Sequence, residues 1–161
     1  MRRFFKYWLP LLIWVCVVFL GSTDMLSAEH TSRFMAPFLL WLKPGMSPDR
    51  IVFILIVMRK SAHVSEYAIL ALLLWRALRS NPTVRLKTPM LVGTVLFACA
   101  VFAASDEFHQ SFVMSRSPSI RDVLLDTAGA ALGLLICASF AHGHGQKTGN
   151  AGRSQFVDAR L

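Results

Sequence analysis

The feature that most constrains this chain is a series of long apolar segments, separated by short stretches that hold most of the charged residues. The apolar segments lie at about residues 7–20, 51–58 with 68–78, 89–104 and 119–140. A helix needs about 20 mainly apolar residues to cross the hydrocarbon core of a bilayer. The sequence therefore predicts an all-α fold, an integral membrane bundle of about four transmembrane helices.

The composition favours a membrane protein over a soluble one. Apolar residues make up 55% of the 161 residues and charged residues 16%, whereas soluble domains are usually about 25% charged. The net charge is +8, which in a soluble protein would point to nucleic acid. Here the basic residues flank the apolar segments, where they orient helices and contact anionic lipid headgroups. We expect membrane lipid, and no nucleic acid, as a partner.

We predict transmembrane helices at about residues 5–22, 49–79, 89–110 and 119–141, within one domain over residues 1–141. A polar, Gly-rich cytoplasmic tail over residues 142–161 is predicted to be disordered. Residues 34–42 are apolar but too short to span, so we expect a short interfacial piece there. Residues 7–20 also resemble a signal peptide, but their length favours a retained helix. Whether the second helix continues through Arg59 and Lys60 stays open.

The distribution of charge predicts the orientation in the membrane. The N-terminus and the loop at residues 76–87 are basic and lack acidic neighbours, whereas the other two loop regions carry acids: Asp24, Glu29, Asp106, Glu107 and Asp122. Cytoplasmic loops carry an excess of Lys and Arg. We therefore predict a multi-pass protein of the cell inner (plasma) membrane, with both the N-terminus and the C-terminus in the cytoplasm.

Three separate polar stretches are predicted to meet at one depth near the outer face. They lie in the second helix, at the end of the third and at the start of the fourth, and their helical spacing places the ionisable groups on inward faces. Charges in a membrane helix cost about 2.5–3.5 kcal/mol each on insertion scales, so they tend to pair inside the bundle. The candidate residues are Lys60, His63, Tyr67, Asp106, Glu107, His109, Gln110, Arg116, Asp122 and Asp126.

Two kinds of chemistry fit these residue types. His63 or His109 could act as a general base, oriented by Asp106, Glu107 or Asp126, which makes these five the candidate catalytic residues. Lys60 and Arg116 could hold an anion such as a lipid phosphate, and the further ligand-binding candidates are Tyr67, Gln110 and Asp122.

Other interpretations of the same residues remain open. An ion-pair network that only joins three helices is about as well supported as a functional pocket. Metal binding is less well supported because no compact His-x-x-x-His spacing occurs, so we predict neither a metal nor another cofactor. Whether the protein is an enzyme stays open.

The motifs resemble those of the VanZ-like family of bacterial membrane proteins over residues 5–138. The family pattern has Phe-x-x-Ser after an aromatic first helix, Lys-x-x-His-x-x-x-Tyr, Asp-Glu-x-His-Gln, an Arg after a short loop, and two Asp before a Gly-rich helix. The matching residues are Phe19, Ser22, Lys60, His63, Tyr67, Asp106, Glu107, His109, Gln110, Arg116, Asp122, Asp126, Gly129 and Gly133. Met114 and Ser115 stand where the family often has Pro-Gly.

The resemblance implies a role in resistance to teicoplanin-type glycopeptide antibiotics or in the cell envelope. The leading hypothesis is an outward-facing polar pocket that binds or modifies a lipid-linked cell-wall precursor or a glycopeptide. The alternative is a non-enzymatic scaffold or transporter-like subunit with a structural ion-pair network. Apolar cytoplasmic halves of the helices argue against transport by a monomer, and the oligomeric state stays open.

Overall fold

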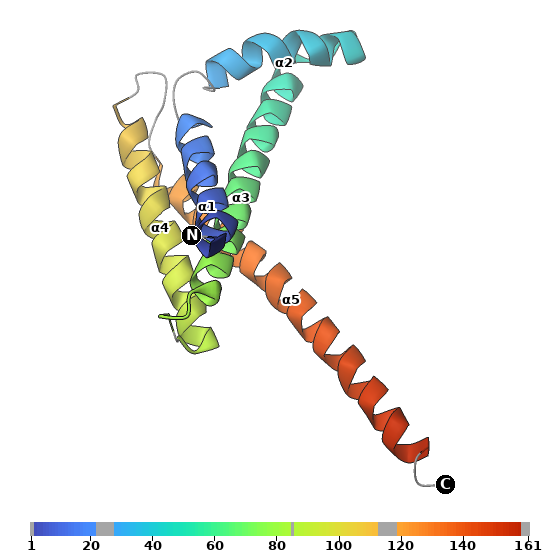
Figure 1. Cartoon of the computed structure of the whole chain (residues 1–161). Helices are drawn as coiled ribbons and strands as arrows, with labels where there is room; N and C mark the ends of the chain where they lie inside the picture. The colour runs from blue at the N-terminus through green and yellow to red at the C-terminus, as the bar shows by residue number, and fades with distance from the viewer. Residues whose placement is uncertain (1, 22–27, 85, 113–118, 159–161) are drawn as a thin grey trace.

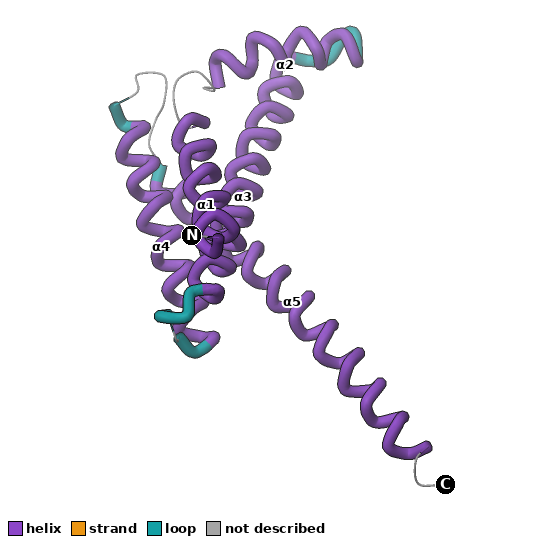
Figure 2. Tube along the Cα trace, in the orientation of Figure 1, coloured by secondary structure: helices purple, strands orange, loops and turns teal. Residues whose placement is uncertain are grey.

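The computed structural model describes residues 2–21, 28–84, 86–112 and 119–158, with side chains for residues 4–21, 32–84, 86–112 and 119–139. These residues form α1 (Arg2–Gly21), α2 (Ala28–Leu42), α3 (Pro48–Ser80), α4 (Thr88–Gln110) and α5 (Ile120–Asp158) (Figure 1). Figure 2 shows helices and connecting loops and no strand in the described ranges. The predicted all-α class is confirmed.

In the described part of the chain, three helices are long and apolar enough to cross a membrane: Phe4–Gly21 of α1, Thr88–Gln110 of α4 and Ile120–Ser139 of α5. The 33 residues of α3 would measure about 50 Å at the usual rise of ~1.5 Å per residue. That length also exceeds a bilayer core, but Arg59, Lys60 and Glu66 make α3 less apolar. The arrangement agrees with the predicted bundle of about four transmembrane helices.

α3 is one continuous helix through the polar stretch at residues 59–67, which answers the question that the sequence leaves open. It begins at Pro48, a residue suited to a first helical turn because it has no amide hydrogen to leave unpaired. It ends before Asn81 and Pro82. The polar residues of α3 are therefore held on one rigid element rather than on a hinge.

The closest helix pairing joins α3 to α5 through two glycines. A Cβ atom added to Gly129 would lie 2.6 Å from the carbonyl oxygen of Val64, and one added to Gly133 would lie 2.5 Å from that of Ala68. Such distances leave no room for any side chain, so the two backbones touch. The GxxxG spacing, which is typical of close helix packing in membranes, thus brings the polar start of α5 against the middle of α3.

α1 runs antiparallel to α3 and packs against it along most of its length. Trp14 Nε1 donates a hydrogen bond to the carbonyl oxygen of Glu66 at 3.0 Å. Near the start of α1, the Arg76 guanidinium lies over the Tyr7 ring at 5.2 Å. The start of α1 therefore lies beside the last turns of α3, and the end of α1 lies at the opposite end of the bundle, toward the polar residues.

α2 extends across the first turns of α3 (Figure 1). Its large apolar side chains are exposed, including Phe34, Phe38 and Trp41. An exposed apolar face on a helix too short to span is typical of a segment that lies in the membrane interface. The helix begins at Ala28, six residues before the apolar stretch that predicts it.

α5 differs from its predicted end near residue 141, because its backbone stays helical to Asp158. The composition of residues 142–158 predicts a segment without regular structure. Extending a helix that already exists costs far less than starting one, since each added residue gains one hydrogen bond. Figure 1 shows this part of α5 leading away from the other helices.

Candidate functional site

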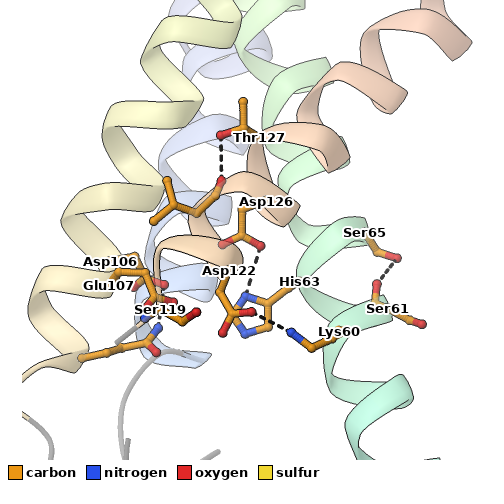
Figure 3. Close-up of polar contacts among 12 residues, drawn as sticks. Lys60, Ser61, His63, Ser65, Asp106, Glu107, Ser119, Asp122, Asp126 and Thr127 are labelled. Carbon is orange, nitrogen blue, oxygen red and sulfur yellow. Dashed lines mark hydrogen bonds and ion pairs between the residues drawn. The ribbon is translucent and has the colours of Figure 1, made fainter. Parts of the chain in front are cut away.

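The polar cluster is formed by eight side chains from three helices, drawn in part in Figure 3. α5 contacts α3 at Gly129 and Gly133, and α4 packs against both helices. The packing gathers residues that lie up to 66 positions apart in sequence, as the positions of the three polar stretches in their helices predict. The members are Lys60, His63 and Tyr67 of α3, Asp106, Glu107 and Gln110 of α4, and Asp122 and Asp126 of α5.

His63 and Asp126 form the inner pair of the polar cluster. His63 Nδ1 lies 3.4 Å from Asp126 Oδ1, but this contact does not meet the geometry of a hydrogen bond, and among the described residues both Asp126 oxygens and His63 Nδ1 have no hydrogen-bond partner. Asp126 is only 1% exposed. A buried carboxyl group without a hydrogen bond is costly, so this pair marks a place where a further group would be stabilised.

Lys60 and Asp122 form the rim pair of the polar cluster. Lys60 Nζ lies 2.7 Å from Asp122 Oδ1, and the two side chains are 51% and 27% exposed. Asp122 lies one helical turn before Asp126, so the rim pair is stacked on the inner pair along the same α3–α5 seam. The Lys60 ammonium group, which the sequence predicts to hold an anion, is occupied by Asp122.

Two buried acidic side chains of α4 have different partners. Gln110 Nε2 donates a hydrogen bond to Asp106 Oδ2 at 2.9 Å, which leaves Asp106 Oδ1 without a partner. Glu107 Oε2 accepts a hydrogen bond from the backbone N–H of Ser119 at 2.8 Å. Because Ser119 directly precedes α5, Glu107 fixes the start of that helix against the end of α4.

Tyr67 lies at the centre of the core, with none of its side chain exposed. Its ring centroid is 6.2 Å from that of Phe102, and its hydroxyl group has no hydrogen-bond partner among the residues that the structure describes. Asp106 and Asp126 are both close enough to act on this hydroxyl electrostatically. A buried hydroxyl group normally finds a partner, so Tyr67 is a second indication of a site built for a polar group.

His109 stands apart from the predicted acid–base arrangement. Its ring lies 4.7 Å from the ring of Phe19, and its Nδ1 atom is buried without a hydrogen bond. Within the described part of the chain, Asp126 contacts a histidine, whereas Asp106 and Glu107 make their hydrogen bonds elsewhere. The orienting role predicted for those two acids thus has no direct contact to support it.

Some predicted features lie outside the described residues, and some contacts were not predicted. Arg116 and Ser22 are outside the described ranges. In those ranges, no group of three or more His, Cys, Asp and Glu residues is arranged to hold a metal ion. Neither the hydrogen bond from Ser119 to Glu107 nor the contact between Phe19 and His109 follows from helical spacing. The Phe-x-x-Ser motif is the sequence signal that includes Phe19.

The polar cluster can bind a hydrogen-bond donor and can accept a proton. Three of its carboxyl groups, those of Asp106, Glu107 and Asp126, are buried on helices, where electrostatic interactions are stronger than in solution. The fold and the cluster define the class of the protein: a polytopic helical membrane protein with buried ionisable groups between its helices, a feature of membrane proteins that usually marks function.

The comparisons with known proteins identify the family. The model of the VanZ/LLP1 family matches residues 7–141, and the chain therefore belongs to this family, which confirms the resemblance seen in the motifs. No curated protein and no solved structure matches the chain significantly.

Proposed function

We propose that this VanZ/LLP1 family protein binds or modifies a lipid-linked ligand of the bacterial cell envelope at the polar cluster, and thereby contributes to glycopeptide (teicoplanin) resistance or to envelope maintenance. The observation that carries the proposal is a group of buried polar atoms without hydrogen-bond partners, contributed by α3, α4 and α5: Tyr67 Oη, Asp106 Oδ1, and Asp126 Oδ1 and Oδ2. A network that only joined helices would satisfy these atoms internally.

The His63–Asp126 pair supports a role in proton transfer. A histidine oriented by a carboxyl group is a common general base, and His63 is the histidine that has such a partner. Asp126 in turn is fixed by the close packing of α5 on α3. If the ligand is modified rather than only bound, His63 is the residue that would accept its proton, with Asp126 as the positioning residue.

The distribution of charge supports an inner-membrane location with cytoplasmic termini. Lys6, Arg76, Arg79 and Lys87 lie at the end of the bundle where α1 begins and α3 meets α4. The positive-inside rule assigns this end to the cytoplasm. The polar cluster then lies toward the outer face, where lipid-linked cell-wall precursors and glycopeptides are found.

The second candidate function is a scaffold whose polar residues only join helices. The Lys60–Asp122 ion pair and the hydrogen bond from Ser119 to Glu107 favour it, since both link separate helices. The scaffold explains the satisfied members of the polar cluster but not the unsatisfied ones. The two candidate functions therefore predict different effects of substituting the inner pair, His63 and Asp126.

Antibiotic susceptibility tests the proposal directly. A deletion strain is complemented with wild type, with His63→Ala plus His109→Ala, or with Asp49→Asn, an exposed acid outside the polar cluster. Membrane levels are compared by blot, and teicoplanin and vancomycin susceptibility is measured. The proposal expects rescue by wild type and Asp49→Asn but not by an equally abundant histidine variant. Equal rescue by all three, or no effect of the deletion, would favour the scaffold.

A further inference from the structure

The polar cluster contains more acidic than basic groups. Asp106, Glu107, Asp122 and Asp126 supply four carboxyl groups, whereas the basic groups among the described residues are Lys60, paired with Asp122, and His63, paired with Asp126. An anionic group entering beside the inner carboxyl groups would meet like charge in a low-dielectric environment. The sequence-based expectation that Lys60 holds a lipid phosphate does not fit this arrangement.

The unsatisfied atoms of the polar cluster are mainly acceptors. Among the described residues, neither oxygen of Asp126 and only one oxygen of Asp106 accepts a hydrogen bond, although His63 Nδ1 lies 3.4 Å from Asp126 Oδ1 and the two acids are at most 5% exposed. Tyr67 is an independent observation: it is fully buried, comes from another helix, and its hydroxyl oxygen has no partner either. What this site lacks is a group with several N–H or O–H donors and a positive charge.

We propose that the polar cluster recognises a primary ammonium group on its lipid-linked ligand. The inference rests on the proposed function for the existence of the ligand and adds its chemistry. A primary ammonium group carries three donors and no acceptor, which matches the three open carboxylate oxygens of Asp106 and Asp126. Hydrogen bonds between ionised partners are stronger than those between neutral groups.

Lipid binding by the purified full-length protein tests this chemistry. Native mass spectrometry in detergent micelles compares three lipids with identical acyl chains: phosphatidylethanolamine, which carries a primary ammonium group; phosphatidylcholine, which carries a cation without N–H donors; and phosphatidylglycerol, which carries hydroxyl donors on an anionic headgroup. We expect the ethanolamine lipid to bind about tenfold more tightly than the other two, the effect of one charge-assisted hydrogen bond.

Three variants test whether the preference for phosphatidylethanolamine depends on the polar cluster. Asp126→Asn and Tyr67→Phe should each reduce the preference for ethanolamine, whereas Asp49→Asn, the same chemical change as the first at an exposed position of α3, should leave it unchanged. Wild type and Tyr67→Phe suffice if Asp126→Asn does not fold. Equal binding of the three lipids, no binding, a preference for phosphatidylglycerol, or an equal effect of Asp49→Asn would each overturn the inference.

The outcome is separate from that of the susceptibility test. If Asp126→Asn abolishes resistance while the wild type shows no ethanolamine preference, the ligand chemistry is wrong and the proposed function stands. If the preference is present and depends on Asp126, but no variant changes susceptibility, the site binds an ammonium group and the proposed role in resistance is wrong.

Discussion

His63 Nδ1 lies 3.4 Å from Asp126 Oδ1, across the place where α3 and α5 come closest. Gly129 is one helical turn beyond Asp126 and touches Val64, the residue next to His63. The separation of the inner pair is therefore set by the backbone contact at Gly129 rather than by the side chains themselves. On one stripe of α5, the small residue Gly129 thus sets how closely the ionisable residue Asp126 approaches α3.

Replacing Gly129 with alanine should separate the helices and destabilise the bundle. The added Cβ would meet the Val64 carbonyl oxygen at 2.6 Å, so α5 must shift, at a cost of about 1–3 kcal/mol typical of overpacking. Unfolding by titration with sodium dodecyl sulfate measures this change. Gly93→Ala is the matched control, because a Cβ at Gly93 in α4 has no atom within 4 Å. Equal stability of the two variants would contradict the close α3–α5 contact.

Removing the carboxyl group of Glu107 should loosen the start of α5. Glu107→Ala leaves the partly buried N–H of Ser119 without its acceptor, with an expected cost of about 1 kcal/mol. Glu107→Gln keeps an amide oxygen that can accept the same hydrogen bond, so its loss of thermal stability should be smaller. The order of the two melting temperatures is the result to compare, and a reversed order would argue against this bond.

The Lys60–Asp122 ion pair should contribute little to stability. Its side chains are partly exposed, and exposed pairs usually contribute about 0.2–1 kcal/mol. A double-mutant cycle with Lys60→Met and Asp122→Asn measures the coupling in the unfolding titration. A coupling far above this range would make the pair a main link between α3 and α5, and would strengthen the scaffold interpretation.

The predicted orientation can be tested by labelling single cysteines. In a variant with Cys16, Cys99 and Cys137 replaced by alanine, Thr83→Cys lies in the loop between α3 and α4, and Gly45→Cys lies between α2 and α3. A thiol reagent that does not cross membranes should label the cysteine at 45 in intact spheroplasts, and that at 83 only after lysis. The opposite pattern would invert the predicted topology.

The helices could be predicted from the sequence because lipid imposes length and apolarity on them. The predicted ranges 49–79 and 89–110 differ by one residue at most from α3 and α4. α5 beyond residue 141 could not be predicted in this way, since no membrane or core constrains that part of the chain. The beginning of α2 at Ala28 was missed because residues 28–33 are polar and carry no apolar period.

Most of the membership of the polar cluster could be predicted, with His109 as the exception among the described candidates, but the pairing within it could not. Helical spacing places His63, Tyr67 and Asp126 on inward faces, and the GxxxG spacing indicates a close approach of α5 to a neighbouring helix without saying which one. The choice of Asp122 rather than a ligand as the partner of Lys60 depends on the rotation and height of α5 against α3. These are set by the Gly129 and Gly133 contacts and cannot be derived from spacing along either helix alone.

The most direct test compares function and stability for the inner pair and the rim pair in the same strains. Asp126→Asn and Asp122→Asn are the same chemical change one helical turn apart on α5. Teicoplanin susceptibility of the complemented deletion strain is measured beside membrane levels and the melting temperature of each purified variant. We expect Asp126→Asn to lose rescue at wild-type abundance and Asp122→Asn to keep most of it. Full rescue by Asp126→Asn, or loss of rescue only in step with lost protein, would contradict the claim that the polar cluster is a binding site.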